Sequence, residues 1–294
     1  MHQHEHHSGL HSAFFINLLF TLIEIAGGLA TNSLAILADA AHDLGDSISL
    51  GMAWILDHLS HQEGDERYSY GYRRFSLLGA LMNALILFGG SLFILSKAIP
   101  RLIQPEPFDA RGMLLLAVLG VVVNGWAVLR LRGDGSLNAR VAALHLLEDV
   151  LGWVAVLLVS LVLQFVDVPI LDPILSIAIT SVVLFRALSF LRQTLAVFLQ
   201  AVPPDMNIDD INTLLREVPG VCSVHHTHLW SLDGEQHVLT THVVLEDDSS
   251  REEAASVKTA IKDVLRSYQL SHITVELEFG EGDCIMSPDA AACE

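Results

Sequence analysis

The sequence is poor in cysteine and in basic residues. Of its 294 residues, three are cysteine, at positions 222, 284 and 293, and 16 Lys and Arg face 34 Asp and Glu, for a net charge of −18. All three cysteines fall in a soluble segment that we place in a reducing cytoplasm, so disulfides are not expected. From Ala201 onward there are 5 basic and 18 acidic residues. This segment should repel nucleic acid and anionic lipid headgroups and attract cations.

Motifs for several energy sources and reactions are also missing. The chain has no P-loop and no aspartyl-phosphate motif that would supply ATP energy, and no HExxH motif of a zinc hydrolase. The first apolar block follows no basic segment and lacks a convincing cleavage site, so we interpret it as a retained helix and not as a signal peptide.

Long apolar blocks are what the sequence does contain. Apolar residues make up 52% of the chain, its mean hydropathy is +0.48, and six blocks reach the roughly 20 residues that cross a bilayer. They lie near residues 12–30, 34–57, 76–99, 112–131, 139–166 and 170–198. The sequence predicts a polytopic α-helical membrane protein with six transmembrane helices over residues 12–199.

Two of these blocks carry the same pair of ionisable residues at the same spacing. His42 and Asp46 lie in the second block, and His145 and Asp149 lie in the fifth. Residues four apart share one helix face, so two facing helices would offer two imidazoles and two carboxylates, a four-ligand set suited to Zn²⁺. Ionisable groups at membrane depth are costly and usually functional. A single buried His–Asp pair could be a structural hydrogen bond, but two matched pairs indicate a metal-transport site.

Physical chemistry suggests protons as the exchange partner. An empty site with two ionised aspartates at membrane depth would be relieved by proton uptake, and histidine titrates where protons and Zn²⁺ compete. Moving a divalent cation out against about 100 mV costs roughly 4.6 kcal/mol. One entering proton returns about 2.3 kcal/mol, plus about 1.4 kcal/mol for each pH unit of gradient.

The loops between the blocks predict the orientation. Basic residues gather in the second-to-third and fourth-to-fifth connections, whereas the first-to-second and fifth-to-sixth connections have none. The basic residues of the former two connections are Arg67, Arg73, Arg74, Arg130, Arg132 and Arg140. By the positive-inside rule these connections and both termini are cytoplasmic, in what we expect to be a bacterial inner membrane.

Residues 200–294 change character after Pro203-Pro204. A helix is expected over Asn207–Glu217, paired strands over Val221–Leu232 and Gln236–Glu246, a helix over Ser249–Tyr268 and a strand over His272–Phe279. The result is a small cytoplasmic α+β domain of αββαβ layout. Strand alternation would place His226 and His228 on one face of the first strand and His225 on the other.

At these residues the sequence resembles the cation diffusion facilitator family of divalent-metal/proton antiporters. Leu37–Asp46 looks like that family's second-helix motif, and His145–Asp149 like its fifth-helix motif in the zinc-preferring branch. The polar residues of the first helix, the start of the sixth and the first strand of the soluble domain match as well. These are Asn17, Glu24, Gly28, Asp172-Pro173 and Thr227–Trp230.

The resemblance implies a homodimer whose ferredoxin-like cytoplasmic domain binds further zinc. Its ligand set would be His228, His242, His272 and Glu278, with Cys284 from the tail; His226 and His237 stay possible members. Each of these residues alone could equally be an ordinary surface group.

Two stretches depart from the family. Where some members carry an Asp and two His in the second-to-third loop, this chain has Asp65 with Tyr68 and Tyr72, and neutral tyrosines are poor zinc ligands. The histidines gather instead in residues 1–11, at positions 2, 4, 6, 7 and 11, as a purification-like remnant, a disordered tail or a metal-collecting arm. A membrane-embedded metal sensor and an intramembrane metalloenzyme are the alternatives to a zinc exporter.

Overall fold

The chain divides into two compact units. The computed structural model describes the backbone of residues 3–60, 62, 64–131 and 137–279. One unit comprises residues 1–59 and 78–192, and the other comprises residues 60–77 and 193–294. The connection between the second and third helices therefore belongs to the same unit as the carboxyl-terminal segment.

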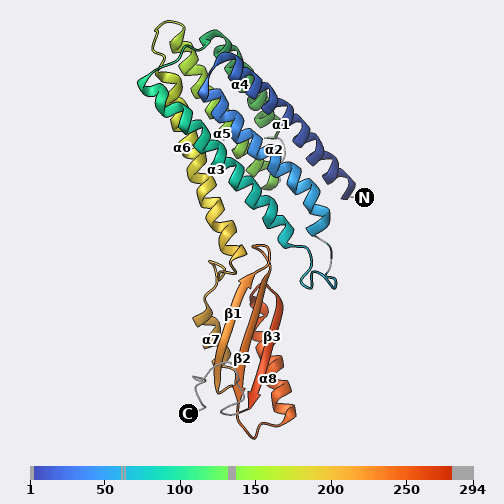
Figure 1. Ribbon diagram of the computed structural model, residues 1–294. Helices are drawn as coiled ribbons and strands as arrows, with labels where there is room; N and C mark the ends of the chain where they lie inside the picture. Colours follow the sequence, from blue (N-terminus) through green and yellow to red (C-terminus); the bar gives the residue numbers. More distant parts are fainter. Residues whose placement is uncertain (1–2, 61, 63, 132–136, 280–294) are drawn as a thin grey trace. The chain divides into compact units, whose positions relative to one another are not determined.

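The first unit is a bundle of six long helices that run alongside one another (Figure 1). They are α1 (Gln3–Thr31), α2 (Leu34–Ser60), α3 (Arg74–Ile103), α4 (Ala110–Leu131), α5 (Leu137–Leu163) and α6 (Leu171–Phe198). By length and apolar composition, five of them could cross a membrane when the described residues are considered. The exception is α2, which is long enough but carries Asp39, Asp43 and Asp46. Large apolar side chains such as Leu115 and Phe185 are 73% and 76% exposed, as expected of a bundle that faces lipid.

Four of the five amino-terminal histidines, at positions 4, 6, 7 and 11, fall within the bounds of the first helix. Because α1 begins at Gln3, the backbone of the segment predicted as a tail is helical from that residue onward. His2 and the side chains before Phe14 lie outside the part of the chain that the structure describes.

Two glycines let neighbouring helices approach the predicted transport residues. A Cβ atom on Gly120 of α4 would lie 2.1 Å from the ring of Trp153 of α5, and one on Gly45 of α2 would lie 2.4 Å from Leu87 of α3. Trp153 is 1% exposed and belongs to the buried core of the bundle. Since Gly45 directly precedes Asp46 and Trp153 lies one turn beyond Asp149, these close contacts fix both helices near the predicted site.

The start of α2 is capped by a residue of another helix. The carboxylate of Asp172, in the first turn of α6, accepts hydrogen bonds from the Ser33 hydroxyl at 2.6 Å, from the Leu34 N–H at 2.9 Å and from the Ala35 N–H at 3.3 Å. It thereby satisfies donors that a helix amino terminus leaves without intrahelical partners. Asp172 thus holds the first turn of α2 against α6.

Replacing Asp172 with Ala should lower the free energy of unfolding by about 2–3 kcal/mol, because buried donors lose a charged acceptor. The measurement is equilibrium unfolding of the purified protein in detergent. Asp167→Ala, which removes an exposed carboxylate from the same connection, is the matched control. Equal stabilities of the two variants would contradict the capping role.

The second unit has the predicted αββαβ order. It contains α7 (Ile208–Arg216), β1 (Ser223–Ser231), β2 (His237–Leu245), α8 (Arg251–Val264), a short 3₁₀ turn (Leu265–Ser267) and β3 (Leu270–Phe279). The sheet order is β1-β2-β3, with β1 and β2 antiparallel and β2 and β3 parallel. Asn207 caps α7, and Ser250 with Glu253 forms a capping box at α8, as their sequence favours.

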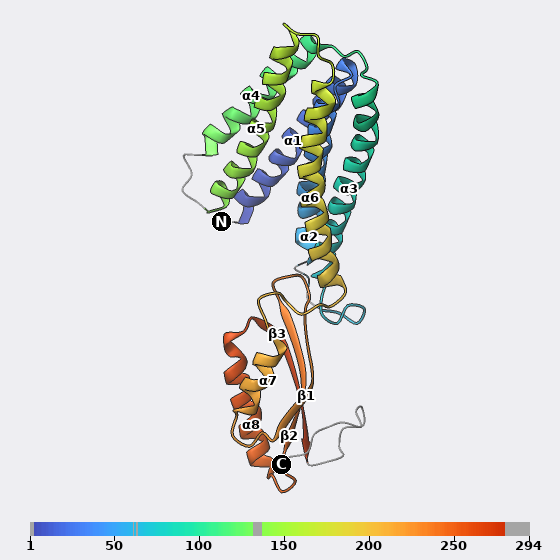
Figure 2. The same ribbon diagram turned by 90° about the vertical axis from the view of Figure 1, so that its left-hand side faces the viewer.

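Helices cover one face of this sheet, and among the described residues no helix covers the other, which we call the open face. Helices α7 and α8 lie against the same face (Figure 2). The core between them includes Leu215 and Ile261 from the helices and Leu229, Leu239 and Val243 from the strands. The side chains that alternate with these strand residues point to the open face.

Candidate metal centres

The matched pairs of α2 and α5 meet in the bundle. Asp46 Oδ2 lies 2.9 Å from His145 Nε2 and 3.7 Å from His42 Nε2, and Asp149 Oδ1 lies 3.9 Å from His42 Nε2. The imidazole rings of His42 and His145 are 5.8 Å apart. The structure therefore brings three of the four predicted residues, His42, Asp46 and His145, within 4.8 Å of one another, and Asp149 approaches this group through His42.

The separations suit a tetrahedral metal ion. Ligand atoms about 2.0–2.2 Å from Zn²⁺ in a tetrahedron lie roughly 3.3–3.6 Å from one another, and the three measured separations lie on both sides of that range. His42, Asp46 and Asp149 have 19%, 25% and 10% of their side chains exposed, and His145 has 43%. The group is thus partly enclosed, with His145 as the member most open to solvent.

Further carboxylates surround this group. Glu24 of α1 and Asp39 and Asp43 of α2 are between 1% and 5% exposed. Both carboxylate oxygens of Glu24 and Oδ2 of Asp39 have no hydrogen-bond donor among the described residues. Asp39 and Asp43 fall within the Leu37–Asp46 motif, and the structure buries both beside Glu24. A buried set of acidic groups favours cations in this part of the bundle.

The remaining polar residues near the site join helices. Asn17 of α1 donates hydrogen bonds to the Asp43 carbonyl at 3.1 Å and to Ser47 Oγ at 3.0 Å, so it joins α1 to α2. Glu148, next to Asp149, forms an ion pair with Arg186 of α6. Its carboxylate is thereby directed away from the His–Asp group, as its position on the helix predicts.

In the second unit, a second His–carboxylate group lies on the open face of the sheet. His242 Nδ1 is 2.6 Å from Glu278 Oε1, and His225 Nε2 is 3.2 Å from Glu278 Oε2. One ligand atom from each of the three residues can be chosen so that all lie within 4.8 Å of one another. The other ring nitrogen of His225, Nδ1, makes no hydrogen bond within the described part of the chain. A set of two histidines and one glutamate is a donor set that fits zinc.

The sequence assigned His225 to the wrong face, and the reason is a β-bulge. His225 pairs with His242, but His228 pairs with Thr240, so β1 carries an extra residue between them. His226, inside the bulge, has a φ angle of +48°. A bulge reverses the alternation that follows it, and the sequence of this strand gives no clear signal for one.

Two residues of the predicted cytoplasmic ligand set lie outside this group. His228 and His272 are exposed, and the His272 ring contacts Tyr70 at 5.6 Å and not the His225–His242–Glu278 group. Cys284 lies outside the described residues. His226 stays close, with its ring 5.3 Å from that of His242. Of the predicted ligand set, the group on the sheet contains His242 and Glu278. It contains His225 in place of His228 and His272.

Cys222 also departs from expectation. It is disulfide-bonded in the structure, although we expected the cysteines to stay reduced. The expectation rested on the redox state of the compartment alone.

Asp65, in the loop where some relatives have a metal site, is instead held by hydrogen bonds. It accepts from the N–H groups of Arg67 and Tyr68 at 2.8 and 2.7 Å and from the Tyr72 hydroxyl at 2.7 Å. The hydrogen bonds from the Tyr68 N–H and the Tyr72 hydroxyl lower the pKa of Asp65. The hydrogen bond between Tyr72 and Asp65 also raises the pKa of Tyr72. The Tyr72 hydroxyl therefore donates to the carboxylate that would bind a metal in those relatives.

Comparison with known proteins matches the whole described architecture. The family described as the cation efflux transmembrane domain matches residues 10–199, and the family described as the cation efflux protein, cytoplasmic domain, matches residues 203–279.

Individual relatives match across nearly their entire length. The cadmium, cobalt and zinc/H(+)-K(+) antiporter of Bacillus velezensis is 31% identical over 287 residues, covering 94% of this chain and 91% of that protein. The metal cation efflux system protein CzcD of Cupriavidus metallidurans is 32% identical, covering 94% and 89%. The zinc transporter ZitB of Pectobacterium atrosepticum is 32% identical, covering 96% and 90%.

Proposed function

Because the chain belongs to the cation efflux family, the cation diffusion facilitators, we propose that it exports Zn²⁺ across a membrane in exchange for protons. The observation that carries the proposal is the meeting of His42 and Asp46 with His145 and Asp149, with separations of 2.9–3.9 Å between neighbouring ligand atoms. Cation efflux proteins are transporters, so the chain is not an enzyme.

The geometry indicates how the site would work. Zn²⁺ gives up its water on binding, and two imidazole nitrogens with two carboxylate oxygens replace that hydration and balance its charge. When the ion leaves, the two negatively charged carboxylates repel each other in a partly enclosed space. Proton uptake removes this repulsion and stabilises the empty site. Protons and Zn²⁺ thus alternate on the same four residues.

Selectivity offers a test of this assignment. Exchanging His42 for Asp makes the donor set richer in oxygen, and oxygen ligands suit harder ions than zinc. The variant should accept Mn²⁺ about tenfold better relative to Zn²⁺ than the parent protein does, measured as competition in a liposome flux assay. His272→Asp, at an exposed position of β3, should leave the metal preference unchanged. An active His42→Asp protein with the parent's preference would contradict a ligand role for His42.

We place both termini and residues 200–294 in the cytoplasm of a bacterium, with the exporter in the inner membrane. The arginines of the second-to-third and fourth-to-fifth connections support this orientation. Residues 1–11, 12–199 and 200–294 would then be a histidine-rich amino-terminal segment, the transport domain and the cytoplasmic domain.

We further propose that the cytoplasmic domain binds regulatory zinc at His225, His242 and Glu278 and forms a homodimer. From Ala201 onward there are 18 acidic and 5 basic residues, so two copies repel each other. Zinc bound on the open face of the sheet lowers that repulsion and favours association. Zinc flux through liposomes separates an exporter regulated in this way from a sensor that transports nothing.

A further inference from the structure

A basic pocket interrupts the acidic second unit. It has a volume of about 340 Å³ and is lined by residues 67–71 and 73–75, by Gln200 and by Trp230 and Leu232 of the β1 end. All of these residues belong to one compact unit. The lining holds three of the chain's 16 basic residues, Arg67, Arg73 and Arg74, and no acidic residue. This local excess of positive charge is opposite in sign to the rest of the unit.

The three arginines differ in how they are paired. Arg73 forms an ion pair with Asp233 at 3.4 Å, and the Gln236 amide oxygen can accept two hydrogen bonds from the Arg73 guanidinium. Arg67 lies over the Tyr68 ring, 5.6 Å from its centroid. Arg74 has a buried Nε without a hydrogen-bond partner in the described part of the chain. Arg74 thus supplies both a charge and an unused donor.

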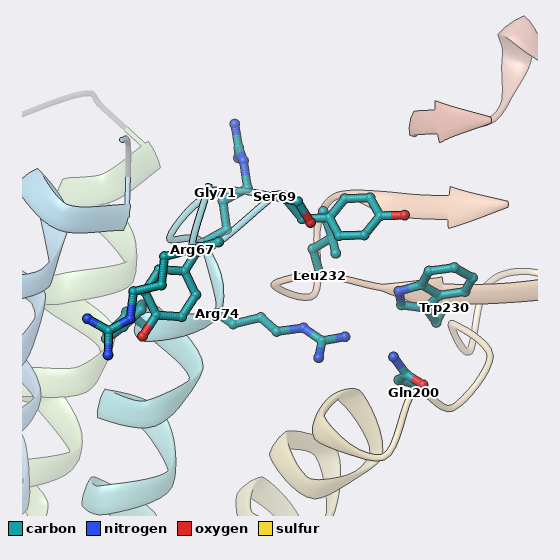
Figure 3. A pocket seen from close by; sticks show the side chains of 11 residues that line it. Arg67, Ser69, Gly71, Arg74, Gln200, Trp230 and Leu232 are labelled. Carbon is teal, nitrogen blue, oxygen red and sulfur yellow. The ribbon is translucent and has the colours of Figure 1, made fainter. Parts of the chain in front are cut away.

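Figure 3 shows the direction of that side chain. The Arg74 guanidinium extends into the hollow toward Gln200 and Trp230, which come from two other segments of the unit. No carboxylate lies within 4 Å of Arg74 among the residues that the structure describes. A planar guanidinium beside an indole ring and an amide is suited to bind a phosphate group, which can accept two hydrogen bonds from it.

The covalent connections place this pocket at the membrane surface. Arg74 is the first residue of α3, and Gln200 follows two residues after the end of α6. Both helices are long and apolar enough to cross a membrane. Arg74 and Gln200 therefore lie where the chain enters or leaves the bilayer. Exposed apolar side chains lie beside it in the sequence: Leu199 is 79% exposed, Val202 39% and Tyr70 47%. Such residues suit the boundary between lipid and water.

We infer that this pocket binds the phosphate of an anionic phospholipid headgroup. Its volume is that of a small-molecule site, its charge is complementary to phosphate, and its location offers lipid at high local concentration. The general expectation that the acidic domain repels anionic headgroups therefore fails at this one place. A bound lipid would join the residue that begins α3 to the segment that follows α6.

Lipid affinity of the full-length protein in detergent, measured by native mass spectrometry, tests the inference. Phosphatidylglycerol should bind about tenfold more tightly than phosphatidylcholine, and Arg74→Gln should remove that preference by weakening phosphatidylglycerol more than phosphatidylcholine. Arg251→Gln, which removes an exposed arginine of α8 in the same unit, is the matched control and should keep the preference. Arg67→Gln gives a second variant that leaves the first residue of α3 intact, and it should weaken the preference in the same direction.

Three results would overturn the inference. The first is equal affinity for both lipids in the parent protein. The second is an equal loss in the Arg74 and Arg251 variants, which would indicate general surface charge. The third is displacement of phosphatidylglycerol by inorganic phosphate at equal concentration, which would assign the pocket to a soluble anion.

Discussion

Zinc flux through the reconstituted protein should fall at least about 100-fold when Asp46 is replaced by Asn. Its carboxylate lies 2.9 Å from His145 Nε2 and 3.7 Å from His42 Nε2, so it is the residue that links the two imidazoles. The amide keeps the shape of the side chain but supplies no negative charge to offset the dehydration of Zn²⁺. Even residues that only support metal ligands change affinity by about 10–100-fold, and a direct ligand should matter more. Asp149→Asn should have the same effect.

Glu148→Gln is the matched control for this experiment. Glu148 neighbours Asp149 in the same helix but pairs with Arg186, so its loss should leave most of the flux intact. The readout is metal uptake into liposomes at equal protein content, with chromatography showing that each variant is folded. Near-parental flux in Asp46→Asn or Asp149→Asn would remove these residues from the transport site.

Zinc affinity of the cytoplasmic segment should fall by about 10–100-fold in either His225→Ala or His242→Ala. Each variant removes one of three ligands whose donor atoms gather within 4.8 Å, and metal affinity depends on the number of correctly placed donors. The segment from Ala201 onward has its own buried core, so calorimetry can be done on it alone.

His228→Ala is the control that separates the structure from the sequence-based ligand set. His228 lies on the same strand but is exposed, and its loss should change zinc affinity less than about threefold. A large effect of His228→Ala together with a small effect of His225→Ala would favour the ligand set that the resemblance implied. No zinc binding at micromolar metal would contradict the regulatory role and leave the membrane site untouched.

The transport residues could be predicted because the geometry of the α-helix fixes which side chains share a face. A four-residue spacing in an α-helix places two side chains on one face regardless of details, so His42 with Asp46, and His145 with Asp149, needed only that α2 and α5 face each other. The apolar blocks likewise predicted the helices of the bundle, since a bilayer requires long apolar segments.

The cytoplasmic ligand set shows why a strand is harder to predict. In a sheet, one extra residue changes the face of every side chain that follows it, and the bulge between His225 and His228 does so. The cap that Asp172 provides for α2 joins residues 138 positions apart in the sequence. Contacts of that range depend on how the helices pack and leave no local pattern in the sequence.

Exchange of zinc for protons on His42, Asp46, His145 and Asp149 is tested most directly in proteoliposomes with an acidic lumen. A zinc dye and a pH dye are placed inside, and Zn²⁺ is added outside. We predict that zinc accumulates in the lumen while the lumenal pH rises, that both signals grow with the imposed gradient, and that both disappear in Asp46→Asn. Zinc accumulation with no proton movement, or with unchanged rates in Asp46→Asn, would contradict exchange at these four residues.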